Sequence, residues 1–199
     1  MTPIHLLLIS GSTRAASTNT ALLRTVQTVL PAGMTATLYR WMGALPHFSP
    51  DDDRPDAGGA AGDAGAGPAA LHPAVADLRR EIAGADAVVF STPEYAGALP
   101  GSFKNLLDWT VGGGEIYRKP VAWLNASSSP TGAANAHASL AIVLGYLSVE
   151  VIEGACTRVP VSRGQVGADG LIADPAIRAQ LGSVFSTLAS ALAQSKRPT

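Results

Sequence analysis

Residues 4–19 read IHLLLISGSTRAASTN, an apolar run followed by a short loop of small polar residues. An apolar run of this length that ends in Ser-Gly is typical of a buried strand. Directly after the loop, Leu22, Leu23, Val26 and Val29 recur at helical spacing. The stretch therefore predicts a strand, a loop and a helix in succession, which is the repeating unit of an α/β fold.

The loop within this stretch carries side chains that bind anions. Besides Arg14 and Asn19 it holds four hydroxyl groups, on Ser12, Thr13, Ser17 and Thr18. A helix N-terminus presents free N–H groups and a partial positive charge, and a guanidinium among hydroxyls suits the phosphate of a monoester. Ser17 has a second interpretation, because serine is also a common helix cap without any ligand.

The spacing of residues in this loop narrows the kind of phosphate it would bind. The loop has neither Gly-x-Gly-x-x-Gly, which lets a backbone approach a pyrophosphate, nor the Gly-Lys-Ser/Thr of a triphosphate-binding loop. We therefore expect a mononucleotide rather than a dinucleotide or a triphosphate.

Composition excludes several classes of protein. A chain of 199 residues is most simply a single domain, 1–199. Its net charge of −1 gives no basic field for nucleic acid, and its one cysteine excludes an intramolecular disulfide and a cysteine-based zinc site. It has no signal-peptide pattern and no apolar run near the ~20 residues that span a bilayer. We expect a cytoplasmic protein without membrane insertion, nucleic-acid partner or metal.

Strand and helix signals alternate along the whole chain. Strand-like runs fall at 4–10, 34–38, 87–91, 121–125 and 149–152, with 158–161 as a short addition. Helical patterns fall at 17–30, 72–83, 102–110, 133–145 and 175–193. The first, third and fourth strand runs are almost wholly apolar, which indicates a parallel sheet covered by helices on both faces. Five strands favour a flavodoxin-like three-layer sandwich, with strand order 2-1-3-4-5, over a six-stranded dinucleotide fold.

One segment breaks this alternation. Residues 51–70 read DDDRPDAGGAAGDAGAGPAA, almost entirely Ala, Gly and Asp. Such a composition has no side chains to pack a core and predicts a flexible insertion. Both an inert surface insertion and a mobile flap near the ligand site fit it.

Two further loops are predicted at the same edge as the first, because ligands in open parallel sheets bind outside the carboxyl ends of the strands. Residues 91–101 read STPEYAGALPG, with Tyr95 in the middle, and residues 125–132 read NASSSPTG. Together the three loops predict a phosphate site beside a wall for a flat heteroaromatic ring. Three ordinary turns without a ligand are the alternative.

Two motifs carry a family resemblance that covers roughly residues 4–147. They are GSTRxxSxN at 11–19 and the longer TPEYxGxxPGxxKNxxDW at 92–109, and a Lys-Pro-Val at 119–121 also fits. On these residues the chain resembles the NADPH-dependent FMN reductases, which include quinone, chromate and azo-dye reductases of flavodoxin-like fold.

The resemblance implies roles for individual residues in binding FMN. The residues expected around the phosphate are Ser12, Arg14, Ser17, Thr18 and Asn19. Those expected along the isoalloxazine, partly through backbone N–H groups, are Pro93, Glu94, Tyr95, Ala96 and Gly97. Ser127 and Ser129 would approach the pyrimidine side of the ring or the ribityl chain. Two departures affect these contacts: many relatives carry Asn at the position of Ala96, and their third loop is often richer in glycine.

The resemblance also implies the activity. The chain would be an NAD(P)H-dependent FMN-containing oxidoreductase that reduces a small acceptor, such as a quinone, a metal oxyanion, an azo compound or free flavin. Because the flavin carries the chemistry, no catalytic acid or base is expected, and we interpret the four histidines as structural or solvated. Relatives form homodimers or homotetramers. The alternative is a non-enzymatic flavodoxin-type electron-transfer protein, against which the near-neutral net charge weighs.

Overall fold

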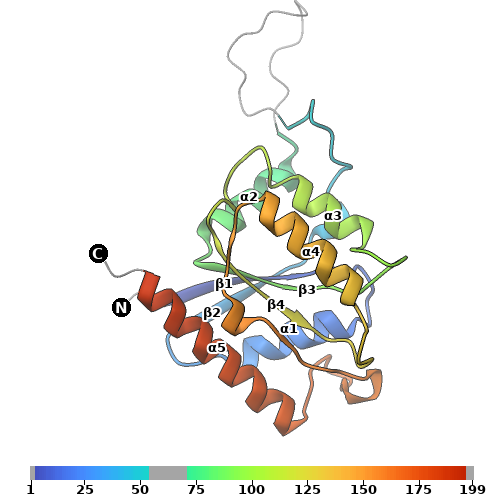
Figure 1. The fold of residues 1–199 in the computed structure, drawn as a ribbon, viewed down its shortest axis with the longest axis vertical. Helices are drawn as coiled ribbons and strands as arrows, with labels where there is room; N and C mark the ends of the chain where they lie inside the picture. Colours follow the sequence, from blue (N-terminus) through green and yellow to red (C-terminus); the bar gives the residue numbers. More distant parts are fainter. Residues whose placement is uncertain (1–2, 54–70, 196–199) are drawn as a thin grey trace, which may run out of the picture.

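The computed structural model describes residues 3–53 and 71–195. A parallel sheet in the order β2-β1-β3-β4-β5 lies between two layers of helices (Figure 1). The strands are β1 (Ile4–Ser10), β2 (Met34–Tyr39), β3 (Ala87–Ser91), β4 (Pro120–Asn125), β5 (Glu150–Val151) and β6 (Thr157–Arg158). The helices are α1 (Thr18–Val29), α2 (Pro73–Gly84), α3 (Gly101–Asp108), α4 (Ala134–Tyr146) and α5 (Pro175–Ser195). The predicted flavodoxin-like order is confirmed.

The apolar character of the central strands follows from their burial on both faces. In β1, Leu6 and Leu8 pack beneath α1 and α5, whereas Leu7 and Ile9 pack beneath α2, α3 and α4. Each of these four side chains is at most 1% exposed. Burying a side chain of this size stabilises the fold by about 1.5–3 kcal/mol, so a polar residue at any of them would be costly.

The fifth position of the sheet is occupied by a broken strand. β5 pairs with β4 at Pro120 and Val121, and β6 pairs with β4 at Leu124 and Asn125. A short 3₁₀ turn, Glu153–Ala155, separates the two pieces. The sequence predicted strands at 149–152 and 158–161, so β5 is shorter than predicted and β6 begins one residue earlier and ends sooner. The backbone still follows β4, because Val159 N donates to Asn125 O at 2.9 Å.

A buried arginine on α2 holds the start of the predicted insertion. Arg79 is 5% exposed, and its Nε and Nη2 donate to Trp109 O at 3.0 and 2.8 Å. Its guanidinium also pairs with Asp53, whose second carboxylate oxygen accepts from Gly112 N at 3.2 Å. Asp53 therefore belongs to the packed domain, although the sequence predicted flexibility from residue 51 onward. Residues 54–70 of that segment lie outside the described residues.

No helix in the described ranges combines the length and the apolar content that crossing a bilayer requires.

Replacing Asp53 should destabilise the domain more than replacing Asp77, the exposed partner of Arg80. Asp53→Ala leaves the Arg79 charge buried, with only Glu115 nearby at 3.9 Å, and should lower the free energy of unfolding by about 3 kcal/mol in urea denaturation. The control is Asp77→Ala, which breaks the exposed Arg80–Asp77 pair and should cost about 1 kcal/mol or less. Equal losses for the two variants would contradict the anchoring role of Asp53.

Candidate functional site

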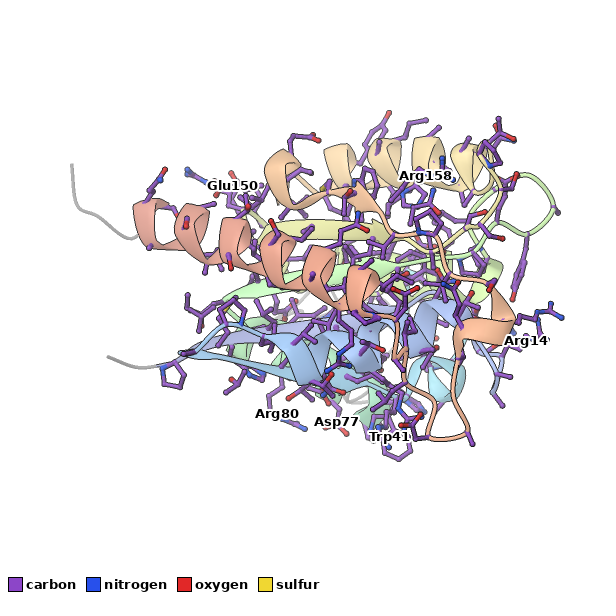
Figure 2. All side chains as sticks on the ribbon, turned by 90° about the horizontal axis from the view of Figure 1, so that it is seen from below. Arg14, Trp41, Asp77, Arg80, Glu150 and Arg158 are labelled. Carbon is purple, nitrogen blue, oxygen red and sulfur yellow. The ribbon has the colours of Figure 1, made fainter. Side chains whose placement is uncertain are left out.

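The three predicted loops meet at the carboxyl edge of the sheet around a cavity of about 420 Å³. We call it the loop cavity. Figure 2 shows Arg14 and Arg158 at this end of the molecule, and Glu150, at the start of β5, toward the other end. The described residues that line the loop cavity are Ser12, Arg14, Ala16, Ser17, Thr18, Asn19, Thr92, Pro93, Glu94, Tyr95, Ala126, Ser127, Ser128, Ala133, Val161, Ser162 and Arg163.

All five residues predicted around a phosphate, from Ser12 to Asn19, line this cavity. The Ser17 hydroxyl accepts from Thr20 N at 3.4 Å and so caps α1. The side chain of Asn19 is held from the sheet, because Ser91 Oγ donates to its Oδ1 at 2.9 Å. Capping and lining the cavity therefore coexist at Ser17, and the N-terminus of α1 opens into the cavity.

Gly11 sets the distance between the first and second loops. A Cβ at this position would lie 2.4 Å from Thr92 Oγ1 and 3.0 Å from a ring carbon of Phe103. Such a contact is far shorter than van der Waals packing permits, and Phe103 is fully buried and cannot move aside. Glycine is required here by close approach of backbone to its neighbours.

In the second loop, Pro93, Glu94 and Tyr95 line the cavity, whereas Ala96 and Gly97 do not. The backbones of Tyr95 and Ala98 exchange two hydrogen bonds of 3.1 Å, so Ala96 and Gly97 form the tip of a tight turn. Both have positive φ, 51° and 74°, as the central residues of this kind of hairpin turn require. The two residues shape the loop from outside the cavity lining.

Glu94 joins the second loop to α4. Its Oε2 accepts from Asn135 N at 2.9 Å and from Ala136 N at 3.1 Å. Ala133, the residue directly before α4, has no side chain able to cap the helix. Glu94 thus supplies a cap from another loop, a contact of about 1 kcal/mol, and the helix dipole stabilises its negative charge.

The third loop is held by side chains from β4 and β6. Asn125 Oδ1 accepts from Ser127 N at 2.9 Å. The Arg158 guanidinium donates to three carbonyl oxygens, those of Pro130 at 2.7 Å, Ser129 at 2.6 Å and Ser127 at 3.3 Å. Ser127 lines the cavity, but Ser129 does not; its carbonyl instead binds Arg158.

Sequence reasoning missed a fourth segment of the site. Val161, Ser162 and Arg163, which follow β6, line the loop cavity. The available signal was that Val161 ends the last predicted strand, 158–161, and that Ser162 and Arg163 follow it, because the rule that ligands bind at carboxyl ends applies to that strand too. Arg163 adds a second guanidinium to the lining. Glu94 is the only carboxylate among the described lining residues, and it is bound to α4, so the cavity favours an anion.

Two other titratable side chains near the site, His137 and Cys156, are packed within the fold. His137, one turn into α4, packs on Trp123 with ring centroids 4.4 Å apart, and burial lowers its pKa below the ordinary value. Burial raises the pKa of the Cys156 thiol to about 11, so the thiol is protonated at neutral pH and is a poor nucleophile. Within the described ranges, no group of three or more His, Cys, Asp or Glu gathers as a metal site.

Comparison with known proteins gives consistent matches. Residues 4–160 match the family described as NADPH-dependent FMN reductase. The chain is 30% identical over 177 residues to an NAD(P)H-dependent FMN reductase of Pseudomonas aeruginosa, covering 88% of each chain. It is 26% identical over 195 residues to a 2-hydroxy-1,4-benzoquinone reductase of a Burkholderia species, covering 94% of this chain and 95% of the relative.

Solved structures agree on the fold. A flavoenzyme NAD(P)H:(acceptor) oxidoreductase from Paracoccus denitrificans superposes with a TM-score of 0.68 at 24% identity, covering 94% of this chain and 98% of that structure. An oxidoreductase from Corynebacterium diphtheriae superposes with a TM-score of 0.61 at 14% identity, covering 98% and 99%.

The chain belongs to the NADPH-dependent FMN reductase family. It is therefore an oxidoreductase whose cofactor is FMN and whose electron donor is NAD(P)H.

Proposed function

We propose that this member of the family holds FMN in the loop cavity and passes electrons from NAD(P)H to a small conjugated acceptor of the quinone class. The observation that carries the proposal is the lining of that cavity, where the N-terminus of α1, a guanidinium and several hydroxyls lie beside the second loop. A phosphate would bind to the helix N-terminus, the guanidinium and the hydroxyls, and a flat ring would lie against the second loop.

The first loop fits the FMN phosphate. Ser12, Ser17 and Thr18 offer hydroxyl donors, Arg14 offers a guanidinium, and α1 offers unpaired backbone N–H groups. The side chain of Arg14 makes no hydrogen bond or ion pair within the described part of the chain, so it is free to bind a ligand. Asn19, buried and fixed by Ser91, would support the same group from inside.

The second and third loops fit the ring and ribityl chain. Pro93, Glu94 and Tyr95 would border the isoalloxazine, and Ser127 would face its polar side. Ala96 and Gly97 would act by holding the turn that presents Tyr95, and Ser129 by the carbonyl that Arg158 binds. Because Arg158 and Glu94 tie these loops to β6 and α4, the binding surface is rigid before the ligand arrives.

The protein's own contribution is position and charge. FMN, when bound, accepts a hydride from NAD(P)H and gives its electrons to the second substrate. The Glu94 carboxylate accepts hydrogen bonds from the α4 backbone, so we assign it the role of positioning the second loop. Arg14 and Arg163 add positive charge, which favours anionic cofactors.

The acceptor class is supported by the relatives and by the open rim of the cavity. Proteins similar to this chain are named 2-hydroxy-1,4-benzoquinone reductase, quinone reductase and NADPH azoreductase. Tyr95 is 47% exposed at the rim and offers an aromatic face to a flat substrate. These names favour an enzyme over a one-electron carrier. The cytoplasmic location expected from the sequence stays a prediction.

An absorbance scan of purified protein tests this function. We expect a flavin spectrum with bands in the visible range, loss of that spectrum on anaerobic addition of NADPH, and its return on addition of a benzoquinone. Protein that gains no flavin spectrum with added FMN would overturn the proposal. Bound flavin that NADPH and NADH both leave oxidised would favour the one-electron carrier instead.

Arg14→Ala should weaken FMN binding by about 1–3 kcal/mol, because it removes a charge-assisted contact to the phosphate. Titration of the apoprotein with FMN measures this loss, and riboflavin, which has no phosphate, should bind wild type and variant alike. Arg80→Ala, which removes an equal charge from the exposed side of α2, is the matched control. An unchanged FMN affinity in Arg14→Ala would remove the phosphate assignment.

We further propose that α4 packs against a second copy of this chain. All 13 residues of α4 are uncharged, and Ile142 and Tyr146 are 63% and 88% exposed. A helix that faces water normally carries charged residues on its outer side, and exposed large apolar groups mark interaction surfaces.

The molar mass of the protein in solution tests this contact. Wild type should have at least twice the mass of one chain, and Ile142→Glu with Tyr146→Glu should reduce it to the monomer, because buried carboxylates without partners are costly. Trp41→Glu, at a side chain that is 61% exposed outside α4, is the matched control and should keep the wild-type mass. A monomeric wild type would contradict the proposal.

A further inference from the structure

Arg163 brings a guanidinium to the loop cavity from a segment that lies outside both sequence motifs. It begins the 3₁₀ turn Arg163–Gln165, which follows β6. Its side chain is exposed and makes no hydrogen bond or ion pair within the described residues. Arg14 is the other arginine of the described lining, and its side chain is also unpaired there. Two free guanidinium groups from segments far apart in the chain therefore line one cavity.

A second cavity, of about 390 Å³, shows at which end of the loop cavity Arg163 lies. We call it the hairpin cavity. The described residues that line it are Ala15, Ala16, Ser17, Thr18, Thr20, Ala21, Arg24, Arg163, Val166, Gly167, Ala168, Asp169 and Gly170. Those that line both cavities are Ala16, Ser17, Thr18 and Arg163. No described residue of the second or third loop is shared in this way. Arg163 thus lies beside the start of α1, at the end of the loop cavity that suits a phosphate.

The backbone on both sides of Arg163 is held by hydrogen bonds. Before it, Val161 N donates to Ala126 O of the third loop at 3.0 Å. Around it, Ser162 N donates to Gln165 Oε1 at 2.9 Å, and Gln165 N donates to Ser162 O at 3.1 Å. A fixed backbone that carries a free side chain loses little conformational entropy when a ligand binds. Arg163 is therefore already positioned for a ligand at this end of the cavity.

The hairpin cavity holds one carboxylate that could compete for Arg163. Asp169 is the single acidic residue of its described lining, and Asp169 Oδ1 accepts from Leu171 N at 3.0 Å. Asp169 makes no ion pair with Arg163 within the described residues. Arg24 lies against this hairpin, since a Cβ at Gly170 would be 2.8 Å from Arg24 Nη1. Arg24 does not line the loop cavity, so the two neighbouring arginines occupy different places.

A phosphate monoester carries more charge than the first loop alone balances. Its charge near neutral pH is about −1.5 to −2. Arg14 supplies one positive charge and the N-terminus of α1 about half of one. Glu94, the single carboxylate of the described lining, is bound to the α4 backbone. A second guanidinium brings the positive charge to that of a dianion, and the phosphate has enough oxygens to accept from both arginines and the helix together.

We propose that Arg163 binds the phosphate of FMN together with Arg14. The proposal rests on the proposed function for the identity of the cofactor, and it adds a binding residue that neither motif contains. Because Val161 is bonded to the third loop, the phosphate would join the first loop to the third through Arg163.

Titration of the apoprotein with FMN and with riboflavin tests the contact. Arg163→Ala should weaken FMN binding about 10- to 100-fold, as loss of a charged hydrogen bond predicts. It should leave riboflavin binding unchanged, which also reports that the variant is folded. Arg163→Lys should recover part of the FMN affinity, because it keeps the charge without the bidentate geometry. Arg24→Ala is the matched control: it removes an equal charge from the hairpin cavity and should keep the wild-type affinity for FMN.

The double variant Arg14→Ala, Arg163→Ala provides the second measurement. It should lose more FMN affinity than either single variant and most of the preference for FMN over riboflavin. Unchanged FMN affinity in Arg163→Ala, an equal loss for FMN and riboflavin, or an equal loss in Arg24→Ala would overturn the proposal. A wild type that binds no FMN would overturn the proposed function as well, whereas FMN affinity that depends on Arg14 but not on Arg163 would overturn this inference alone.

Discussion

Parallel pairing of strands that are buried on both faces is the constraint on which this structure depends. Because β1, β3 and β4 run in one direction, each connection to the next helix leaves the sheet at the same edge. Polar backbone groups that the sheet cannot satisfy therefore gather there, together with the N-termini of α1 and α4. The anion-binding character of that edge follows from topology before any side chain is considered.

A small set of long-range contacts turns this edge into a defined surface. Gly11 permits the first and second loops to touch, Glu94 caps α4, and Arg158 binds three carbonyls of the third loop. The Glu94 and Arg158 contacts also give backbone N–H and C=O groups of these segments hydrogen-bond partners. Glu94 and Arg158 thus use their charges on the protein itself, whereas the side chain of Arg14 makes no hydrogen bond or ion pair within the described residues.

The local pattern of apolar residues was enough to predict most of the fold. Strand and helix positions agreed with the structure within a few residues. The central strands were recognisable because strands buried on both faces of a sheet consist of uninterrupted apolar residues. The motif GSTRxxSxN led to the residues from Ser12 to Asn19, and all five predicted there line the cavity. Their gathering in one loop could be predicted because they are neighbours in the chain, and their role in binding the phosphate stays a prediction.

What the tertiary structure alone decided involves residues far apart in sequence. The pairing of Asp53 with Arg79 and the cap that Glu94 provides to Asn135 each join separate elements. The same holds for Arg163, which reaches the cavity from beyond the broken fifth strand. Apolar periodicity determines which element forms and which face it buries. The order of the strands in the sheet, and the place where each segment crosses its carboxyl edge, decide which charged residues come together. A local sequence pattern contains no information about either.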